Sequence, residues 1–165
     1  MLQSATGLAR AALLAAGLAA ITPAAAGAAP PAGPMGAIHA FVDSFNRGDI
    51  ASAQAANEPD VRIIDEFAPH EWHGPGSFQA WVGDLGKEAK AKAQTDQKVT
   101  IGQVVRQVVD GDTAYVVVRV VYTYREHGKP IIEPAEMAVA LRNETSGWKI
   151  ASWAWAGETP RPAKR

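Results

Sequence analysis

The chain has 165 residues, of which 47% are hydrophobic and 20% charged, a balance typical of one globular domain. Its formal net charge of −1 leaves no basic excess to follow a phosphate backbone, so we expect no nucleic-acid partner. The absence of cysteine excludes disulfides and thiolate metal sites.

The first 34 residues differ in composition from the rest. Residues 11–21 form an apolar run, too short to span a bilayer, between the single charge of Arg10 and a set of small residues that suits a cleavage site. We interpret residues 1–28 as a signal peptide and the proline-rich residues 29–34 as a linker. The alternative is an alanine-rich leader without that role. A signal peptide predicts a periplasmic or secreted protein with no membrane contact after cleavage.

Helical patterns dominate the first half of the remaining chain. Residues 35–47 carry apolar side chains at the i, i+3, i+4, i+7 spacing of an amphipathic helix. Asp49 is a candidate cap for a short helix over residues 50–56. A strand over residues 61–65 and a third helix over residues 75–93 follow.

Strand patterns dominate the second half. Alternating apolar residues and turn sequences predict four antiparallel strands, over residues 99–109, 113–125, 130–143 and 148–156. The domain then covers residues 35–158, with a disordered tail at 159–165. Helices before strands favour an α+β fold, in which a curved antiparallel sheet packs its concave face on the N-terminal helices in a cone-shaped barrel. The hollow between the two layers is the expected cavity for a small hydrophobic molecule.

Three segments resemble the nuclear transport factor 2-like superfamily, which includes SnoaL-like polyketide cyclases and ketosteroid isomerases. They are FVDSFNRGD at residues 41–49, DVRIID at residues 60–65 and GWKI at residues 147–150. The resemblance covers residues 36–158. It implies that Asp65 falls on the proton-shuttling base of ketosteroid isomerases. In the segment EPAE at residues 133–136, Glu136 falls on the acid that stays protonated to donate to the substrate oxygen. The tyrosine on the first helix of those enzymes is Phe41 here, which removes part of the oxyanion hole.

The two acids also have a rationale of their own. In a half-buried cavity the pKa of Asp65 would rise toward the range useful for a general base, whereas the alternative is a strand-end aspartate that caps the next loop. Glu136 shares strand parity with Ala138 and Ala140, whose small side chains leave room beside the acid. The alternative is a solvated glutamate on the outer face of the sheet.

The last strand places Ser152 and Ala154 on one side and Trp153 and Trp155 on the other. If the small residues face the cavity, the tryptophans lie on the outer face and predict a homodimer through the sheet. The alternative is that the tryptophans line the pocket. With the small residues inside, the predicted ligand-binding residues are Phe41, Phe45, Trp72, His73, Phe78, Trp81, Ser152 and Ala154.

The loop after the first strand contains Glu66, His70, Glu71 and His73. These could ligate a metal, but no second cluster exists, so we expect no metal and interpret the loop as a rim with Trp72 as an apolar lid. We also expect no cofactor, because no nucleotide-binding or nucleophile–base motif occurs. Two functions stay open. One is a cofactor-independent isomerase, cyclase or lyase that uses Asp65 and Glu136. The other is a non-catalytic binding or accessory domain that acts through its pocket or outer sheet face.

Overall fold

The computed structural model describes residues 33–164, so the predicted signal peptide and nearly all of the linker lie outside the described residues. Two helices, α1 (Pro34–Asn46) and α2 (Ile50–Ala55), come first. Strands β1 (Asn57–Ile64) and β2 (Glu71–Trp72) and helix α3 (Ser77–Ala91) follow. The remaining elements are β3 (Gln94–Asp110), β4 (Thr113–Glu126), β5 (Lys129–Glu144), β6 (Gly147–Gly157) and β7 (Arg161–Pro162).

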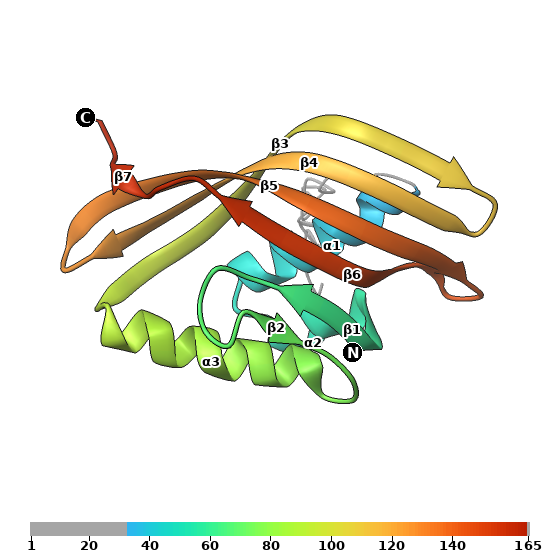
Figure 1. The fold of residues 1–165 in the computed structure, drawn as a ribbon, viewed down its shortest axis with the longest axis horizontal. Helices are drawn as coiled ribbons and strands as arrows, with labels where there is room; N and C mark the ends of the chain where they lie inside the picture. The colour runs from blue at the N-terminus through green and yellow to red at the C-terminus, as the bar shows by residue number, and fades with distance from the viewer. Residues whose placement is uncertain (1–32, 165) are drawn as a thin grey trace, which may run out of the picture.

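One curved sheet joins the seven described strands in the order β2-β1-β6-β5-β4-β3, with β7 beside β5. Strands β3 to β6 form the predicted antiparallel meander, whereas β1 runs parallel to β6, so the sheet is mixed. The long strands arch over α3, β1 and β2 (Figure 1). Helix α1 packs against β3, β4 and β6. The predicted α+β architecture is therefore confirmed.

The core lies between the helices and the concave face of the sheet. Each apolar side chain that is fully buried there stabilises the fold by about 1.5–3 kcal/mol. The amphipathic face predicted for α1 is the buried one, and alternate residues of β4 and β5 oppose it. The buried residues are Ile38, Phe41 and Val42 on α1, Phe78 and Trp81 on α3, Val116, Val118 and Val120 on β4, and Met137, Val139 and Leu141 on β5.

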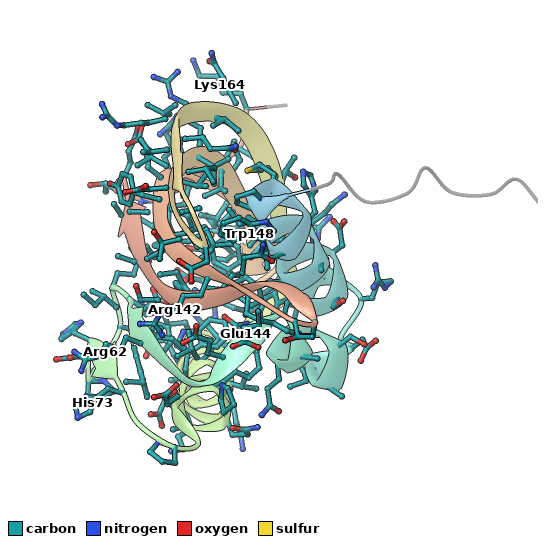
Figure 2. The ribbon with its side chains drawn as sticks, turned by 90° about the vertical axis from the view of Figure 1, so that its right-hand side faces the viewer. Arg62, His73, Arg142, Glu144, Trp148 and Lys164 are labelled. Atoms are coloured by element: carbon teal, nitrogen blue, oxygen red, sulfur yellow. The ribbon has the colours of Figure 1, made fainter. Side chains whose placement is uncertain are left out.

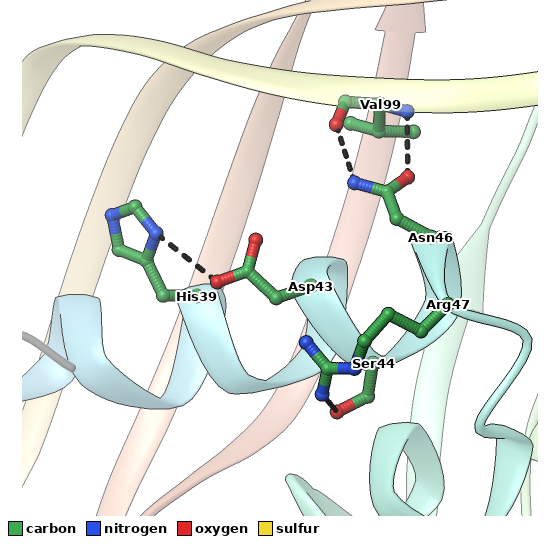
Figure 3. Close-up of polar contacts among 6 residues, drawn as sticks. All are labelled: His39, Asp43, Ser44, Asn46, Arg47 and Val99. Carbon is green, nitrogen blue, oxygen red and sulfur yellow. Dashed lines mark hydrogen bonds and ion pairs between the residues drawn. The ribbon is translucent and has the colours of Figure 1, made fainter. Parts of the chain in front are cut away.

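The segment at residues 41–49 ties helix α1 to strand β3 and starts helix α2 (Figure 3). The side-chain amide of Asn46 donates to the backbone oxygen of Val99 at 2.7 Å and accepts from its N–H at 2.8 Å. Gly48 then adopts a left-handed φ of 71°, which side chains disfavour. Asp49 caps α2 by accepting from the N–H of Ser52 at 3.0 Å. This segment, one of the three that resemble the superfamily, thus has a structural role.

Besides the parallel strand, two further features differ from the sequence predictions. Arg161 and Pro162, in the predicted disordered tail, pair with Ile132 and Ile131 of β5. Strand β6 carries a bulge, because Ile150 pairs with Leu141 while Ser152 pairs with the adjacent Ala140. Within residues 33–164, every helix is too short or too polar to cross a membrane.

Candidate functional site

A cavity of about 330 Å³ opens between α1, α3 and the concave face of the sheet. Its wall combines eight aromatic rings with four carboxylates and one lysine. The lining residues are Phe41, Val42, Phe45, Asp65, Glu66, Phe67, Trp81, Leu85, Glu88, Lys92, Gln94, Val99, Tyr122, Tyr124, Glu133, Met137, Trp153, Trp155 and Pro160.

Asp65 follows the last residue of β1 and lines this cavity, as predicted. One carboxylate oxygen accepts from Trp81 Nε1 at 2.9 Å, and the other accepts from the N–H of Glu66 at 2.7 Å. Burial raises the pKa of Asp65 to about 6, although both hydrogen bonds oppose that rise. The backbone contact is the loop cap considered above, so the residue makes that contact and also faces the cavity.

The ring that holds Asp65 is itself fixed by other aromatic residues. Trp81 lies 5.0 Å from Trp153 between ring centroids, with the planes 86° apart. Phe41 packs against both tryptophans at 6.3 and 5.7 Å. The edge-to-face contacts of Trp81 with Trp153 and Phe41 favour one orientation of its ring, so the indole N–H stays directed at the carboxylate.

Glu133 of β5 is the second acid of the cavity, and its residue is 1% exposed. Its Oε1 accepts from Trp155 Nε1 at 2.7 Å. Burial raises the pKa of Glu133 well above its usual range, and the charge and hydrogen bond of Glu66 raise it further. A side chain at Gly157 would collide with the carboxylates of Glu133 and Glu66, which would have to shift to admit it.

Glu136 does not reach the cavity, and the prediction that it faces the ligand is wrong. It lies on the opposite face of β5, where its carboxylate is 3.7 Å from Nε of Arg119. Strand alternation puts the bulky Met137 and Val139 in the core, and Glu133 shares their parity. The segment at residues 133–136 was identified, but the small alanines were taken to mark the cavity. Parity with the bulky residues was the signal that could have found Glu133.

The two small residues predicted on β6, Ser152 and Ala154, do not line the cavity. Trp153 and Trp155 line it instead, because they pair with the buried residues Val139 and Met137 of β5. The alternative in which the tryptophans face the pocket is therefore confirmed. The tryptophans therefore do not lie on the outer face and give no support to a homodimer. Dimerisation itself stays a prediction.

The predicted aromatic residues divide into two layers. Phe41, Phe45 and Trp81 line the cavity. Phe78 is buried behind them, in edge contact with Phe41 at 6.1 Å, and does not line it. Trp72 is also buried rather than a lid, because its Nε1 donates to Asp84 at 3.0 Å while its ring packs on Phe67.

His73 lies away from the cavity, contrary to prediction. Its side chain is 66% exposed and 3.6 Å from Glu71. Figure 2 shows it at the periphery of the molecule. Among residues 33–164, no three histidine, aspartate or glutamate side chains gather in a geometry that could hold a metal ion.

Sequence reasoning missed the two tyrosines of the cavity, Tyr122 and Tyr124, whose rings lie 4.8 Å apart on β4. Burial raises the pKa of Tyr122, so its hydroxyl keeps its proton. This hydroxyl and the Nε1 of Trp153 are buried without a hydrogen-bond partner among the described residues. A ligand oxygen within reach of either donor would recover a free energy of about 1–3 kcal/mol.

Comparisons with known proteins are consistent with this architecture. A family model described as the SnoaL-like domain matches residues 38–148. A ketosteroid isomerase-like protein from Erwinia carotovora atroseptica has a similar structure, with a TM-score of 0.59 and 20% identity over 77% of this chain and 95% of that one. The hexachlorocyclohexane dehydrochlorinase LinA-type3 from Novosphingobium barchaimii has a TM-score of 0.63 and 13% identity over 77% and 88%. At these identities the likeness concerns the fold alone. No curated protein matches the chain in sequence.

Proposed function

The chain belongs to the SnoaL-like domain family, and from this premise we propose that its cavity binds a small, largely apolar molecule and transfers a proton on it without a cofactor. The observation that carries the proposal is the pair of carboxyls, Asp65 and Glu133, placed by different elements in one aromatic cavity. Both have a raised pKa, from burial first. Acids of this kind suit proton transfer near neutral pH.

The two acids have complementary roles in this mechanism. Asp65 is the base, because at neutral pH it is mainly ionised and yet accepts a proton readily. It removes a proton from a carbon beside a carbonyl, and the electron pair moves onto the carbonyl oxygen. Protonated Glu133 donates a hydrogen bond to that oxygen. The hydroxyl of Tyr122 is a second donor in a cavity where Phe41 has none.

The enolate can react in two ways, and each corresponds to one reaction class. Return of the proton to a different carbon is an isomerisation. Departure of a group beside the carbanion is an elimination of the lyase type. The rings around Asp65 exclude water from the reacting carbon, which strengthens both hydrogen bonds to the enolate.

The test is exchange of carbon-bound hydrogen for deuterium in a panel of small ketones, followed by NMR. We expect Asp65→Asn to slow the exchange about 10²–10⁴-fold, the usual contribution of a general base. Asparagine keeps an oxygen for the Trp81 indole, so the fold should persist, as circular dichroism would check. The matched control is Glu71→Gln, which removes one exposed carboxylate outside the cavity. A folded Asp65→Asn variant with undiminished exchange would refute the base.

A second candidate is binding without turnover, and Phe41 favours it because this ring brings no hydroxyl to the cavity. In that case a ligand binds the native chain and Asp65→Asn equally, and no ketone exchanges its protons. The same panel therefore decides between the two functions.

Export is a separate proposal, supported by the apolar run and small residues within residues 1–28. Mass spectrometry of the chain recovered from the periplasm or medium would show a mature N-terminus near residue 29. An intact N-terminus in the cytoplasm would contradict export.

A further inference from the structure

We propose that the cavity selects an organic cation, a quaternary or protonated amine on an apolar body. The inference rests on the proposal that this cavity binds a small molecule, and it adds the chemical class of that molecule. Two independent features of the wall support it: an excess of carboxylates and a set of aromatic rings in several orientations.

The ionisable groups of the wall are almost all acids, and at pH 7.5 Asp65 is mainly ionised while Glu133 is close to its pKa of about 7. Asp65 and Glu133 lie inside, and the exposed Glu66 stands at the mouth. The only lysine or arginine in the lining is Lys92, whose Nζ is 2.7 Å from Glu88, so this cation is already paired. The three acids Asp65, Glu66 and Glu133 thus outnumber the cationic groups of the wall, where Lys92 interacts with Glu66 as well as with Glu88. Low-dielectric walls lined by one sign of charge concentrate ions of the opposite sign.

The rings offer the second attraction. Cations bind the faces of tryptophan, tyrosine and phenylalanine within about 6 Å of the ring centre. Tyr122 stands edge-on to Trp155, with centroids 6.2 Å apart and planes at 84°, and Trp81 stands edge-on to Trp153. Rings turned against one another in this way present faces from several directions around one space. Because the aromatic rings are apolar, they also accept the hydrocarbon body of an amine.

A metal ion fits this wall less well than an organic cation. Glu66 and Glu133 meet beside Gly157, but the residues that the structure describes contain no set of three side chains arranged as metal ligands. A metal ion needs several oxygen or nitrogen ligands at short distance. A quaternary ammonium group has no such requirement, because it interacts with ring faces and with charge at longer range.

Binding of a cation should depend on pH, because a bound cation stabilises the ionised forms of the acids. The cation therefore lowers the pKa of Asp65 and Glu133 in the complex and releases protons. Affinity should rise between pH 5 and about 8, as Asp65 and Glu133 pass their pKa values of about 6 and about 7, and then level off. The other ionisable groups that act on these acids are Glu66 and His70 from the loop and Tyr122 and Tyr124 from β4. The ion pair of Glu88 with Lys92 also lines the cavity.

The test compares choline with 3,3-dimethylbutan-1-ol, its uncharged counterpart of the same shape, by isothermal titration calorimetry. We expect choline to bind at least about tenfold more tightly at pH 7.5, a difference of about 1.4 kcal/mol. We expect that preference to shrink at pH 5. Equal affinity for the two compounds, or tighter binding of the alcohol, would overturn the proposal.

A pair of variants locates the effect. At pH 8.5, where Glu133 is ionised with or without Glu66, Glu66→Gln should weaken choline at least about threefold and leave the alcohol unchanged, since one charge of the cavity is lost. Glu71→Gln has the same change of net charge but lies outside the cavity, and it should leave choline binding as it is. Equal weakening by both variants would mean that only the overall charge matters, and would overturn the site. If Glu66→Gln does not fold, the comparison of choline with its counterpart at two pH values still decides.

Failure of this inference is distinguishable from failure of the proposed function. Deuterium exchange of uncharged ketones without choline binding would overturn the cation and leave proton transfer intact. Choline binding without any deuterium exchange would overturn proton transfer and leave the cation site intact.

Discussion

The two faces of β5 place glutamate side chains in opposite environments. Glu133 is buried on the concave face, bonded to an indole and beside other carboxylates, and its pKa is raised. Glu136, three residues later, is half-exposed and paired with Arg119. The difference teaches that the chemistry of a carboxyl on this sheet follows from its strand parity rather than from its residue type.

The neighbouring strand repeats this contrast with apolar residues. Val118 of β4 is fully buried on the concave face, whereas Val117 is only partly buried on the other. Tyr115 shares the parity of Val117 and is 45% exposed. The concave face carries the core and the candidate site, whereas the outer face holds apolar residues that the described chain covers only in part.

The largest expected effect separates the two glutamates. Glu133→Leu removes the proposed donor to the enolate oxygen, so deuterium exchange should fall about 10²–10³-fold. Glu136→Leu, with the same change on the outer face, should leave the rate within about twofold, as expected for a side chain outside the cavity. An equal loss in both variants, at equal unfolding temperatures, would end the assignment of the acid to Glu133.

The next effect is on stability as a function of pH. Because the pKa of Asp65 is raised from 3.8 to about 6 on folding, the folded state binds more protons than the unfolded state between these values. The stability that this proton provides is complete below pH 3.8 and is lost as pH rises through about 6. Asp65→Asn should therefore be more stable than the native chain at pH 7.5, by about 2–3 kcal/mol.

Urea unfolding at pH 4 and pH 7.5 measures this effect. The stability difference between the native chain and Asp65→Asn should grow between the two values. Glu136→Gln is the matched control on the outer face and should show no such growth. A constant difference for Asp65→Asn would show that the acid is solvated.

A smaller effect compares two valines that differ only in the face they occupy. Val118→Ala should lower the free energy of unfolding by about 2 kcal/mol, through lost burial and the cavity left behind. Val117→Ala should cost less than about 1 kcal/mol if the outer face is free. A comparable cost at Val117 that grows with protein concentration would instead support the predicted homodimer, which sedimentation would confirm.

The smallest expected effect concerns Gly157, where the acids of the concave face meet. Gly157→Ala should destabilise the chain by about 1–2 kcal/mol, because its methyl group must displace the carboxyls of Glu133 and Glu66, which can partly shift. Gly83→Ala is the control, since that position in α3 has open space and should gain about 0.5–1 kcal/mol. Thermal unfolding measures both. A neutral Gly157→Ala would mean that the acids do not meet there.

Sequence periodicity located most of the fold, because amphipathic helices and alternating strands carry their own signals. The acid at the end of β1 was also predicted correctly to face the cavity. Glu133 was missed because small residues were taken to mark the hollow, whereas the hollow lies among bulky side chains such as Met137. Tyr122 was missed because its strand is apolar on both sides in the sequence.

Other features depend on contacts between distant segments and leave no local pattern. The parallel pairing of β1 with β6 joins residues about 90 positions apart, such as Ile63 and Trp153. The bulge in β6 arises where this strand meets β5, and it puts Ile150 and Trp153 in the core together. Alternation counted along the sequence cannot anticipate that inserted residue.

The irregular pairing of β3 has a consequence for self-association. This strand ends the sheet, so one of its sides presents backbone groups to which another chain could add a strand. Its register with β4 shifts at three places, and the charged residues Lys98 and Arg106 lie along it. Interruptions of this kind deprive an incoming strand of a straight template. The same irregularities therefore allow the sheet to bend over the candidate cavity and help to keep the chain from assembling edge to edge into aggregates.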